Sequence, residues 1–192
     1  MLQAFNWYSH THGSWFKHVT NQVYSYKSAG VTKIWLPPPS KSHTKEGYFP
    51  DDYLNFNSEY GTEDDLLNLL EVCEDAGIEP IADVVSWTCL PTFCRDAFNF
   101  GGELCEPGSK EHWGLLNAWM KYLLTIGFKG FRMDMAEHVP ETLFEGIPKD
   151  TFIVGEVWTT MNYGHDGRLA YDQDNHRQRI MNYVDRHDGI CS

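Results

Sequence analysis

The order of apolar segments along the 192-residue chain is the feature that most restricts its fold. Short strand-like segments alternate five times with segments whose apolar residues recur at helical spacing. The expected strands cover residues 2–7, 31–36, 78–85, 128–134 and 151–158. The expected helices cover residues 14–30, 62–77, 109–126, a short segment from Pro140, and 174–184. No hairpin signal joins two of the strands, so the pattern predicts an α/β fold with a parallel sheet, either a barrel or an open sheet.

The second helix carries the clearest boundary signals. Thr62 followed by Asp65 resembles a capping box, and Gly77 is suited to end the helix. The apolar stripe between them consists of Leu66, Leu69, Leu70 and Cys73.

Two of the expected strands end in acids. Asp134 closes the segment 130–134, and Glu156 lies near the end of the segment 151–158. Parallel α/β folds place their chemistry at the C-terminal ends of the strands, where these two carboxylates would face one cleft. Glycoside hydrolysis needs such a pair. The alternative is that both acids are structural and have only local hydrogen-bond partners.

Composition excludes several classes of partner. The net charge of -12 argues against nucleic acid and against an anionic membrane surface, and it is compatible with a neutral substrate. No stretch approaches 18 apolar residues, so a membrane span is not expected. Strand-like sequence follows Met1 almost at once, without the pattern of a secretory signal, which favours a cytoplasmic or plastid location.

The five cysteines do not suggest a disulfide framework. Cys89, Cys94 and Cys105 lie near His112, but no C-x-x-C pair is present, so zinc is not expected. Reduced thiols are the favoured interpretation, and no metal ligands are assigned.

Taken together, these segments resemble the α-amylase family of glycoside hydrolases, in particular its plant-type members. The resemblance covers nearly the whole chain. The matching segments are Gln3-Ala4-Phe5-Asn6-Trp7, Gly30-Val31-Thr32-Lys33-Ile34-Trp35-Leu36-Pro37-Pro38, Gly47-Tyr48-Phe49-Pro50, Ile81-Ala82-Asp83-Val84-Val85, Gly130-Phe131-Arg132-Met133-Asp134-Met135-Ala136, Gly155-Glu156-Val157-Trp158-Thr159 and Gln173-Asp174-Asn175-His176-Arg177-Gln178.

The resemblance implies a role for each of several residues. Asp134 matches the nucleophile, and Glu156 matches the general acid/base of a retaining mechanism. Asp83 matches a structural acid at the end of strand three. The implied substrate-binding residues are Tyr48, Arg132, His138 and Trp158. Among these, Tyr48 would stack on the sugar, His138 would lie beside the scissile bond, and Arg132 would keep the nucleophile ionised.

The sequence departs from the family pattern near the end of strand three. Trp87 and Thr88 replace an Asn that binds calcium and a His that grips the sugar. The subdomain inserted after strand three, which supplies further calcium ligands, is reduced to residues 86–108. Glu137 stands where many relatives carry Lys. Calcium is therefore the one cofactor that the resemblance suggests, and these replacements weaken the case for it.

A further departure concerns the eight strands of the family fold. The segment ending in Asp188 imitates the third catalytic acid of the family, but it follows Glu156 by only about thirty residues, so we interpret Asp188 as a helix-end acid. The expected fold is a partial TIM barrel that covers about the first five β/α units, in a single catalytic domain over residues 1–192. Five strands cannot close the usual barrel, so the open edge predicts a homo-oligomer.

The leading functional hypothesis is hydrolysis of α-1,4-glucosidic bonds in starch-like α-glucans, with weakened activity. The alternative is a catalytically degenerate relative that binds α-glucan or acts as a scaffold. A phosphate-binding doubly wound enzyme is disfavoured, since no Gly-rich loop follows the first strand.

Overall fold

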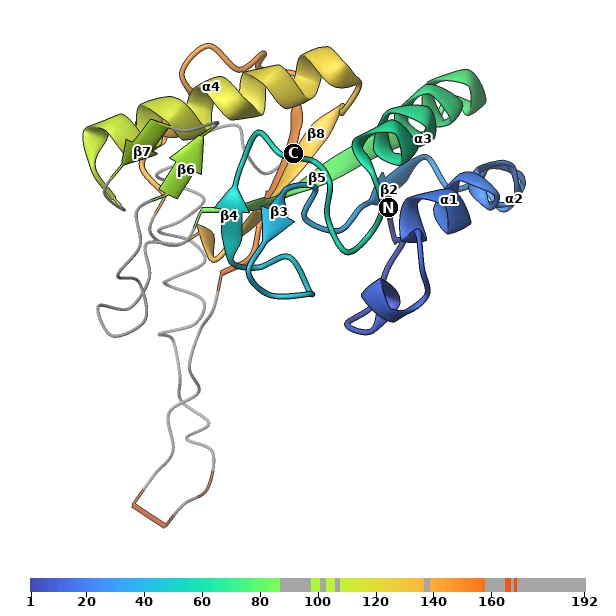
Figure 1. Ribbon diagram of the computed structural model, residues 1–192, viewed down its shortest axis with the longest axis horizontal. Helices are drawn as coiled ribbons and strands as arrows, with labels where there is room; N and C mark the ends of the chain where they lie inside the picture. The colour runs from blue at the N-terminus through green and yellow to red at the C-terminus, as the bar shows by residue number, and fades with distance from the viewer. Residues whose placement is uncertain are drawn as a thin grey trace.

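A five-stranded parallel sheet is the centre of the molecule (Figure 1). The computed structural model describes residues 1–86, 98–100, 103–105, 108–136, 139–157, 165, 166 and 168. The strands lie in the order β1-β2-β5-β8-β9. Their bounds are β1 Leu2–Gln3, β2 Lys33–Trp35, β5 Glu79–Val85, β8 Gly130–Asp134 and β9 Phe152–Gly155. The predicted parallel α/β fold is confirmed, and within the described residues the sheet stays open, with β1 and β9 as its edges.

Helices cover one face of this sheet, and Figure 1 shows α3 and α4 lying beside β5 and β8. The helices are α1 Trp15–Thr20, α2 Val23–Ser28, α3 Glu63–Ala76 and α4 Lys110–Ile126, with short 3-10 helices η1 Ser9–Thr11 and η3 Glu141–Phe144. Their buried faces meet alternate residues of the strands in one core, namely Ile34, Ala82, Val84, Phe131, Met133 and Ile153. Removing this apolar surface from water is the main stabilisation of the fold.

The opposite face of the sheet carries the polar residues. Successive side chains of a strand point to opposite faces. The register pairs Asp83 with Arg132, and Val85 with Asp134. Since Phe131 and Met133 point into the helix-covered core, Arg132 and Asp134 point away from it. The sequence alternation along β8 therefore separates a packing face from a candidate site face.

The signals predicted for the second helix are confirmed in α3. The Thr62 hydroxyl accepts a hydrogen bond from the Asp65 backbone N–H, while the Asp65 carboxylate accepts one from the Thr62 N–H. Gly77 ends the helix in the left-handed region, at φ +64°. Cys73 is buried as a free thiol, and burial raises its pKa to about 12.

The helix predicted over residues 14–30 is wrong as a single helix, because it breaks between α1 and α2. Thr20 lies at the break, and its hydroxyl donates to the Phe16 carbonyl. Such back-bonding competes with the regular helical ladder. The Gln22 N–H then bonds to the Val19 carbonyl, three residues back. Val19 and Val23 both stay fully buried across the break, so packing tolerates it.

Among the described residues, no hairpin joins two of the five strands of the parallel sheet, as the sequence predicts, but two short antiparallel pairs lie outside that sheet. Lys41–Ser42 (β3) pairs antiparallel with Pro50–Asp52 (β4), and Phe98–Phe100 (β6) pairs antiparallel with Glu103–Cys105 (β7). Backbone groups in these connecting segments still need hydrogen-bond partners, and short antiparallel pairing supplies them. The second pair falls within the predicted insertion 86–108, which was expected to be irregular.

Several expected elements have different lengths. The predicted strand 2–7 narrows to Leu2–Gln3, because Asn6 begins a turn in which its side chain accepts from the Tyr8 N–H. The predicted strand 151–158 narrows to Phe152–Gly155. The short helix expected from Pro140 is present as η3. The helix predicted over 174–184 lies outside the described residues.

Candidate active site

One guanidinium group organises the acids at the C-terminal rim of the sheet. The Arg132 Nη1 atom lies 2.8 Å from Asp83 Oδ1 and 2.7 Å from Asp134 Oδ1. Its Nη2 atom lies 2.5 Å from Glu156 Oε2. The sheet thus brings together Asp83 from β5, Asp134 from β8 and Glu156 from the end of β9, as the strand-end pattern predicted.

Because the ion cluster is buried, its charged groups are stabilised by one another rather than by water. Asp83 is fully buried, and Arg132 and Asp134 are nearly so. Burial alone would lower the pKa of Arg132, but Asp83, Asp134 and Glu156 raise it above its usual value. The guanidinium therefore stays charged beside the acids. Glu156 is the most accessible of the three acids, with 37% of its side chain exposed, so it can meet a molecule from solution.

Asp83 occupies the innermost position of the cluster. Burial raises the pKa of its carboxyl to about 7, although the charge and hydrogen bond of Arg132 act in the opposite direction. The Tyr48 hydroxyl donates to Asp83 Oδ2 over 3.1 Å. Burial, followed by the charge of Asp83, raises the pKa of Tyr48, so its phenol remains a protonated donor.

An aromatic surface adjoins the acids. The rings of Trp7 and Tyr48 stack with their centroids 6.1 Å apart and an angle of 9° between their planes. Trp7 is 59% exposed, so one large flat surface faces solvent next to a hydroxyl that contacts the acid cluster. Stacked aromatic faces suit the apolar faces of sugar rings. Sequence reasoning did not assign Trp7 to the site, although it belongs to the matched segment 3–7, because its stacking partner Tyr48 lies far along the chain and only the fold brings the two rings together.

The backbone after β8 is held in an unusual conformation. Met135 adopts φ +45°, in the left-handed region that non-glycine residues rarely occupy. The Glu156 N–H bonds to the Met133 carbonyl, and the Ala136 N–H bonds to the Glu156 carbonyl. The Ser86 hydroxyl donates to the Asp134 carbonyl over 3.3 Å. These bonds tie the turn after Asp134 to both neighbouring strands and so fix the position of the two acids.

Two of the six residues implied for catalysis and substrate binding lie outside the described part of the chain. They are His138 and Trp158, and Trp87, Thr88, Glu137 and Asp188 lie outside it as well. The described residues contain no group of three or more His, Cys, Asp or Glu side chains arranged to hold a metal ion. The three acids of the cluster already share a guanidinium, which is a poor setting for a second cation, and the indole of Trp87 offers no oxygen ligand for calcium.

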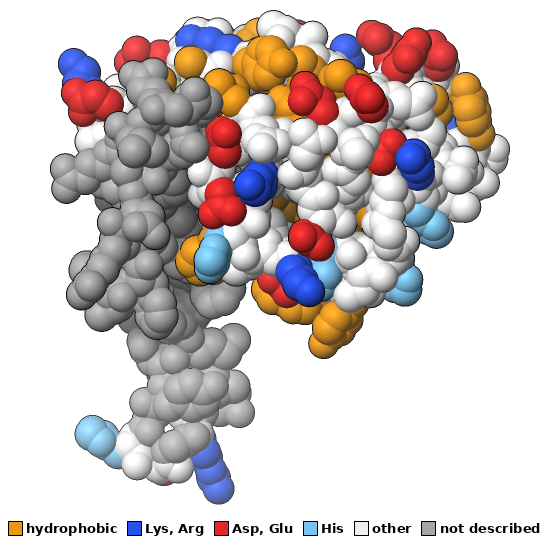
Figure 2. Space-filling view, in the orientation of Figure 1, with side chains coloured by type: hydrophobic (Ala, Val, Ile, Leu, Met, Phe, Trp, Pro, Cys, Tyr) orange, Lys and Arg blue, Asp and Glu red, His pale blue; other side chains and the backbone are white. Residues whose placement is uncertain are grey.

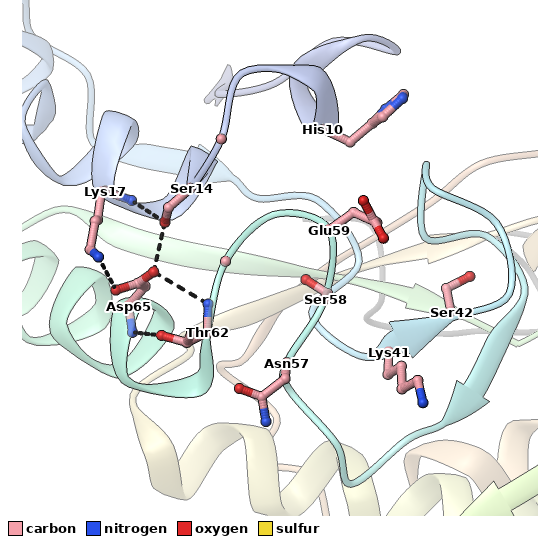
Figure 3. Close-up of a pocket in the computed structure, with 12 residues that line it drawn as sticks. His10, Ser14, Lys17, Lys41, Ser42, Asn57, Ser58, Glu59, Thr62 and Asp65 are labelled. Atoms are coloured by element: carbon pink, nitrogen blue, oxygen red, sulfur yellow. Dashed lines mark hydrogen bonds and ion pairs between the residues drawn. The ribbon is translucent and has the colours of Figure 1, made fainter.

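A separate polar cavity of about 620 Å³ opens over the loops that follow β1 and β2 (Figure 3). No residue of the acid cluster lines it. At one side Asp65 accepts from the Ser14 hydroxyl over 2.7 Å and pairs with Lys17 over 3.2 Å. Figure 3 shows this network together with the Thr62 cap, while His10 and Glu59 lie across the cavity. These polar contacts join α1 to the start of α3.

The described surface is mixed in charge. On the face drawn in Figure 2, Asp and Glu side chains are interspersed with Lys and Arg, and no continuous basic stripe is seen among the described residues. In the part of the chain with assigned structure, none of the helices combines the length and apolar character needed to cross a bilayer.

Comparison with known proteins gives consistent matches. The family described as "Alpha amylase, catalytic domain" matches residues 9–90. Probable alpha-amylase 2 of Arabidopsis thaliana is 33% identical over 96% of this chain and 53% of that protein. Alpha-amylase 3, chloroplastic, of the same plant is 29% identical over 100% of this chain and 26% of that protein. The chain thus spans about half of the first relative and about a quarter of the second.

Solved structures share the fold. The α-amylase of Geobacillus thermoleovorans complexed with acarbose superposes with a TM-score of 0.64 at 23% identity, over 91% of this chain and 44% of that one. An Anoxybacillus α-amylase gives a TM-score of 0.65 at 19% identity, over 90% of this chain and 43% of that one. These structures show the shared fold. The family model over residues 9–90 and the plant relatives identify the chain as a member of the α-amylase family of glycoside hydrolases.

Proposed function

We propose that this chain hydrolyses α-1,4-glucosidic bonds in starch-like α-glucans by a retaining mechanism. The observation that carries the proposal is the sharing of one guanidinium by Asp134 and Glu156. A retaining double displacement requires two carboxyl groups on the order of 5 Å apart. Two acids held by neighbouring nitrogens of Arg132 lie close together, as that mechanism requires.

In the first step, the Asp134 carboxylate attacks the anomeric carbon, and a glycosyl-enzyme ester forms as the glycosidic C–O bond breaks. Glu156 gives its proton to the leaving oxygen at the same time. In the second step, the Glu156 carboxylate takes a proton from water, whose oxygen attacks the anomeric carbon and releases Asp134. Arg132 keeps the nucleophile ionised throughout, since its positive charge favours the carboxylate form.

The surroundings of the acids would hold the sugar. The stacked rings of Trp7 and Tyr48 present a flat surface for a glucose unit, and the Tyr48 hydroxyl is fixed by Asp83. We further propose His138 and Trp158 as contacts around the scissile bond, from their places in the sequence. We expect turnover to be weakened, because Trp87 and Thr88 stand where relatives carry groups that bind calcium and the substrate.

The alternative is an α-glucan-binding protein that has lost catalysis, which the replacements at Trp87 and Thr88 favour. The name of the chloroplastic relative supports the plastid among the compartments expected from the sequence.

Release of reducing ends from soluble starch tests the proposal. The purified chain should release them slowly, and Asp134→Asn and Glu156→Gln should each abolish the release. The exposed acids Asp150 and Glu141 supply matched controls, since Asp150→Asn and Glu141→Gln should leave it unchanged. Retention on a starch column without any release would favour the binding protein. Equal release by all five proteins would identify a contaminating enzyme and refute the proposal.

A further inference from the structure

The Arg132 guanidinium has a partner that none of its ion pairs explains. Its central carbon Cζ lies over the ring of Trp35, 4.7 Å from the centroid. The ion pairs use the edge of the guanidinium, where Nη1 and Nη2 meet the acids. The stacking uses its flat face. The two kinds of contact are compatible, and together they restrict both the position and the tilt of the group.

Trp35 is itself rigidly placed. It lies on β2, where its carbonyl accepts from the Ala4 N–H and its neighbour Leu36 bonds to the Ile81 carbonyl. Phe5 packs its ring edge against the indole, with centroids 5.1 Å apart and planes at 86°. The indole is therefore a fixed support rather than a mobile side chain.

Arginine has many rotamers, so holding its side chain in one orientation costs conformational entropy. The fully buried Asp83 and the nearby Asp134 would hold the Nη1 end without help. The Nη2 end meets Glu156, whose side chain is 37% exposed, so solvent weakens this ion pair. Without a surface beneath it, the guanidinium can tilt toward the buried acids and leave Glu156.

We propose that Trp35 is a positioning residue, which holds the Arg132 guanidinium in the one orientation that contacts Asp134 and Glu156 together. This inference rests on the hydrolase function proposed above. It assigns Trp35 an effect on the geometry of the acid pair and no contact with the substrate. The indole Nε1 makes no hydrogen bond to any described residue. A phenyl ring should therefore supply the same support, and an aliphatic side chain of similar bulk should not.

Steady-state kinetics on starch separates this role from packing. Trp35→Leu should lower kcat about tenfold or more while KM stays within about twofold, because a misplaced acid pair weakens transition-state interactions rather than substrate binding. Trp35→Phe should retain kcat within about threefold, because its ring keeps a face for the cation. Trp113→Leu is the matched control and should change neither parameter, because Trp113 lies on α4 and packs against the helix-covered core rather than on the face of the sheet that carries the acids. A rise in KM with unchanged kcat, or equal losses in both Trp35 variants, would refute the proposal.

A double-mutant cycle gives an answer that does not depend on activity. Unfolding by urea is compared for the wild type, Trp35→Leu, Arg132→Met and the double variant. If the indole supports the guanidinium, the factor by which Trp35→Leu lowers the folding equilibrium constant should be about tenfold smaller in the Arg132→Met background than in the wild type. That difference is the size expected of a buried cation–π contact. Additive effects would show that Trp35 only fills space. Failure of the starch assay in the wild type would refute the proposed function, while this cycle would still decide the role of Trp35.

Discussion

Replacing Arg132 with Met should destabilise the protein strongly and in a pH-dependent manner. The change removes a cation that lies 2.8 Å from Asp83 and 2.7 Å from Asp134, two acids with at most 5% exposure. Removing one partner of a buried ion pair costs about 3–5 kcal/mol, since the other charges stay buried without compensation. Glu156 is exposed enough to be solvated and adds little to this loss.

The dependence on pH follows from Asp83. Its pKa is already raised to about 7 by burial, and loss of Arg132 removes the effect that opposes that rise. A group whose folded-state pKa lies above its unfolded value stabilises the fold fully below the unfolded pKa, about 4. That stabilisation is lost as the pH rises through the folded pKa. The deficit of the variant should therefore be largest at pH 8 and should shrink at pH 5.

Urea denaturation followed by tryptophan fluorescence measures this deficit. With a slope of about 2 kcal/mol per molar urea, the midpoint at pH 8 should fall by about 2 M. Lys129→Met is the matched control, because Lys129 pairs with Glu74 over 3.4 Å at the surface and should contribute less than about 1 kcal/mol. Adding Asp83→Asn to the Arg132 variant should recover part of the loss at pH 8. A deficit below about 1 kcal/mol, or one of equal size at both pH values, would refute this account of the cluster.

Four further outcomes are expected. Gly130→Ala makes a Cβ clash with the Phe152 carbonyl oxygen and should lower the free energy of unfolding by about 1–3 kcal/mol. Gly114→Ala, with open space in α4, should raise it by up to about 1 kcal/mol in the same urea assay. Burial alone would raise the pKa of Asp65, but hydrogen bonds from Ser14 and the Thr62 backbone and the pairing with Lys17 lower it. The cost of Asp65→Asn in thermal melts should thus be complete above the unfolded pKa, about 4, and should be lost as the pH falls through the lower folded pKa; a cost that does not fall on acidification below pH 4 would contradict the assignment. A calcium chelator should shift the melting temperature by no more than about two degrees, because Trp87 stands in place of an Asn that binds calcium in relatives. A saturated family-type site would contribute several kcal/mol, so a larger drop would establish such a site. Light scattering should detect association of the protein through the sheet edges that stay open among its described residues, and a monomer at all micromolar concentrations would argue against it.

The sequence predicted the parts of the fold that depend on local pattern. The alternation of β8 assigned Phe131 and Met133 to one face and Arg132 and Asp134 to the other, because successive strand residues point to opposite sides. The boundaries of α3 were equally readable, since capping at Thr62 and the left-handed turn at Gly77 need only neighbouring residues. Where an element depended on several weak preferences, as in the break between α1 and α2, the local pattern did not suffice.

The contacts of the candidate site were decided by tertiary structure. Sequence spacing placed Asp134 and Glu156 at strand ends, but it did not show that one guanidinium holds both of them together with Asp83. Nor did it reveal that Trp35, about a hundred residues earlier, lies against that guanidinium. Periodicity specifies which face of a strand a side chain occupies, because that depends on backbone geometry alone. Which side chains meet across the sheet depends on the order of the strands and their register, and these are set by the packing of the whole chain.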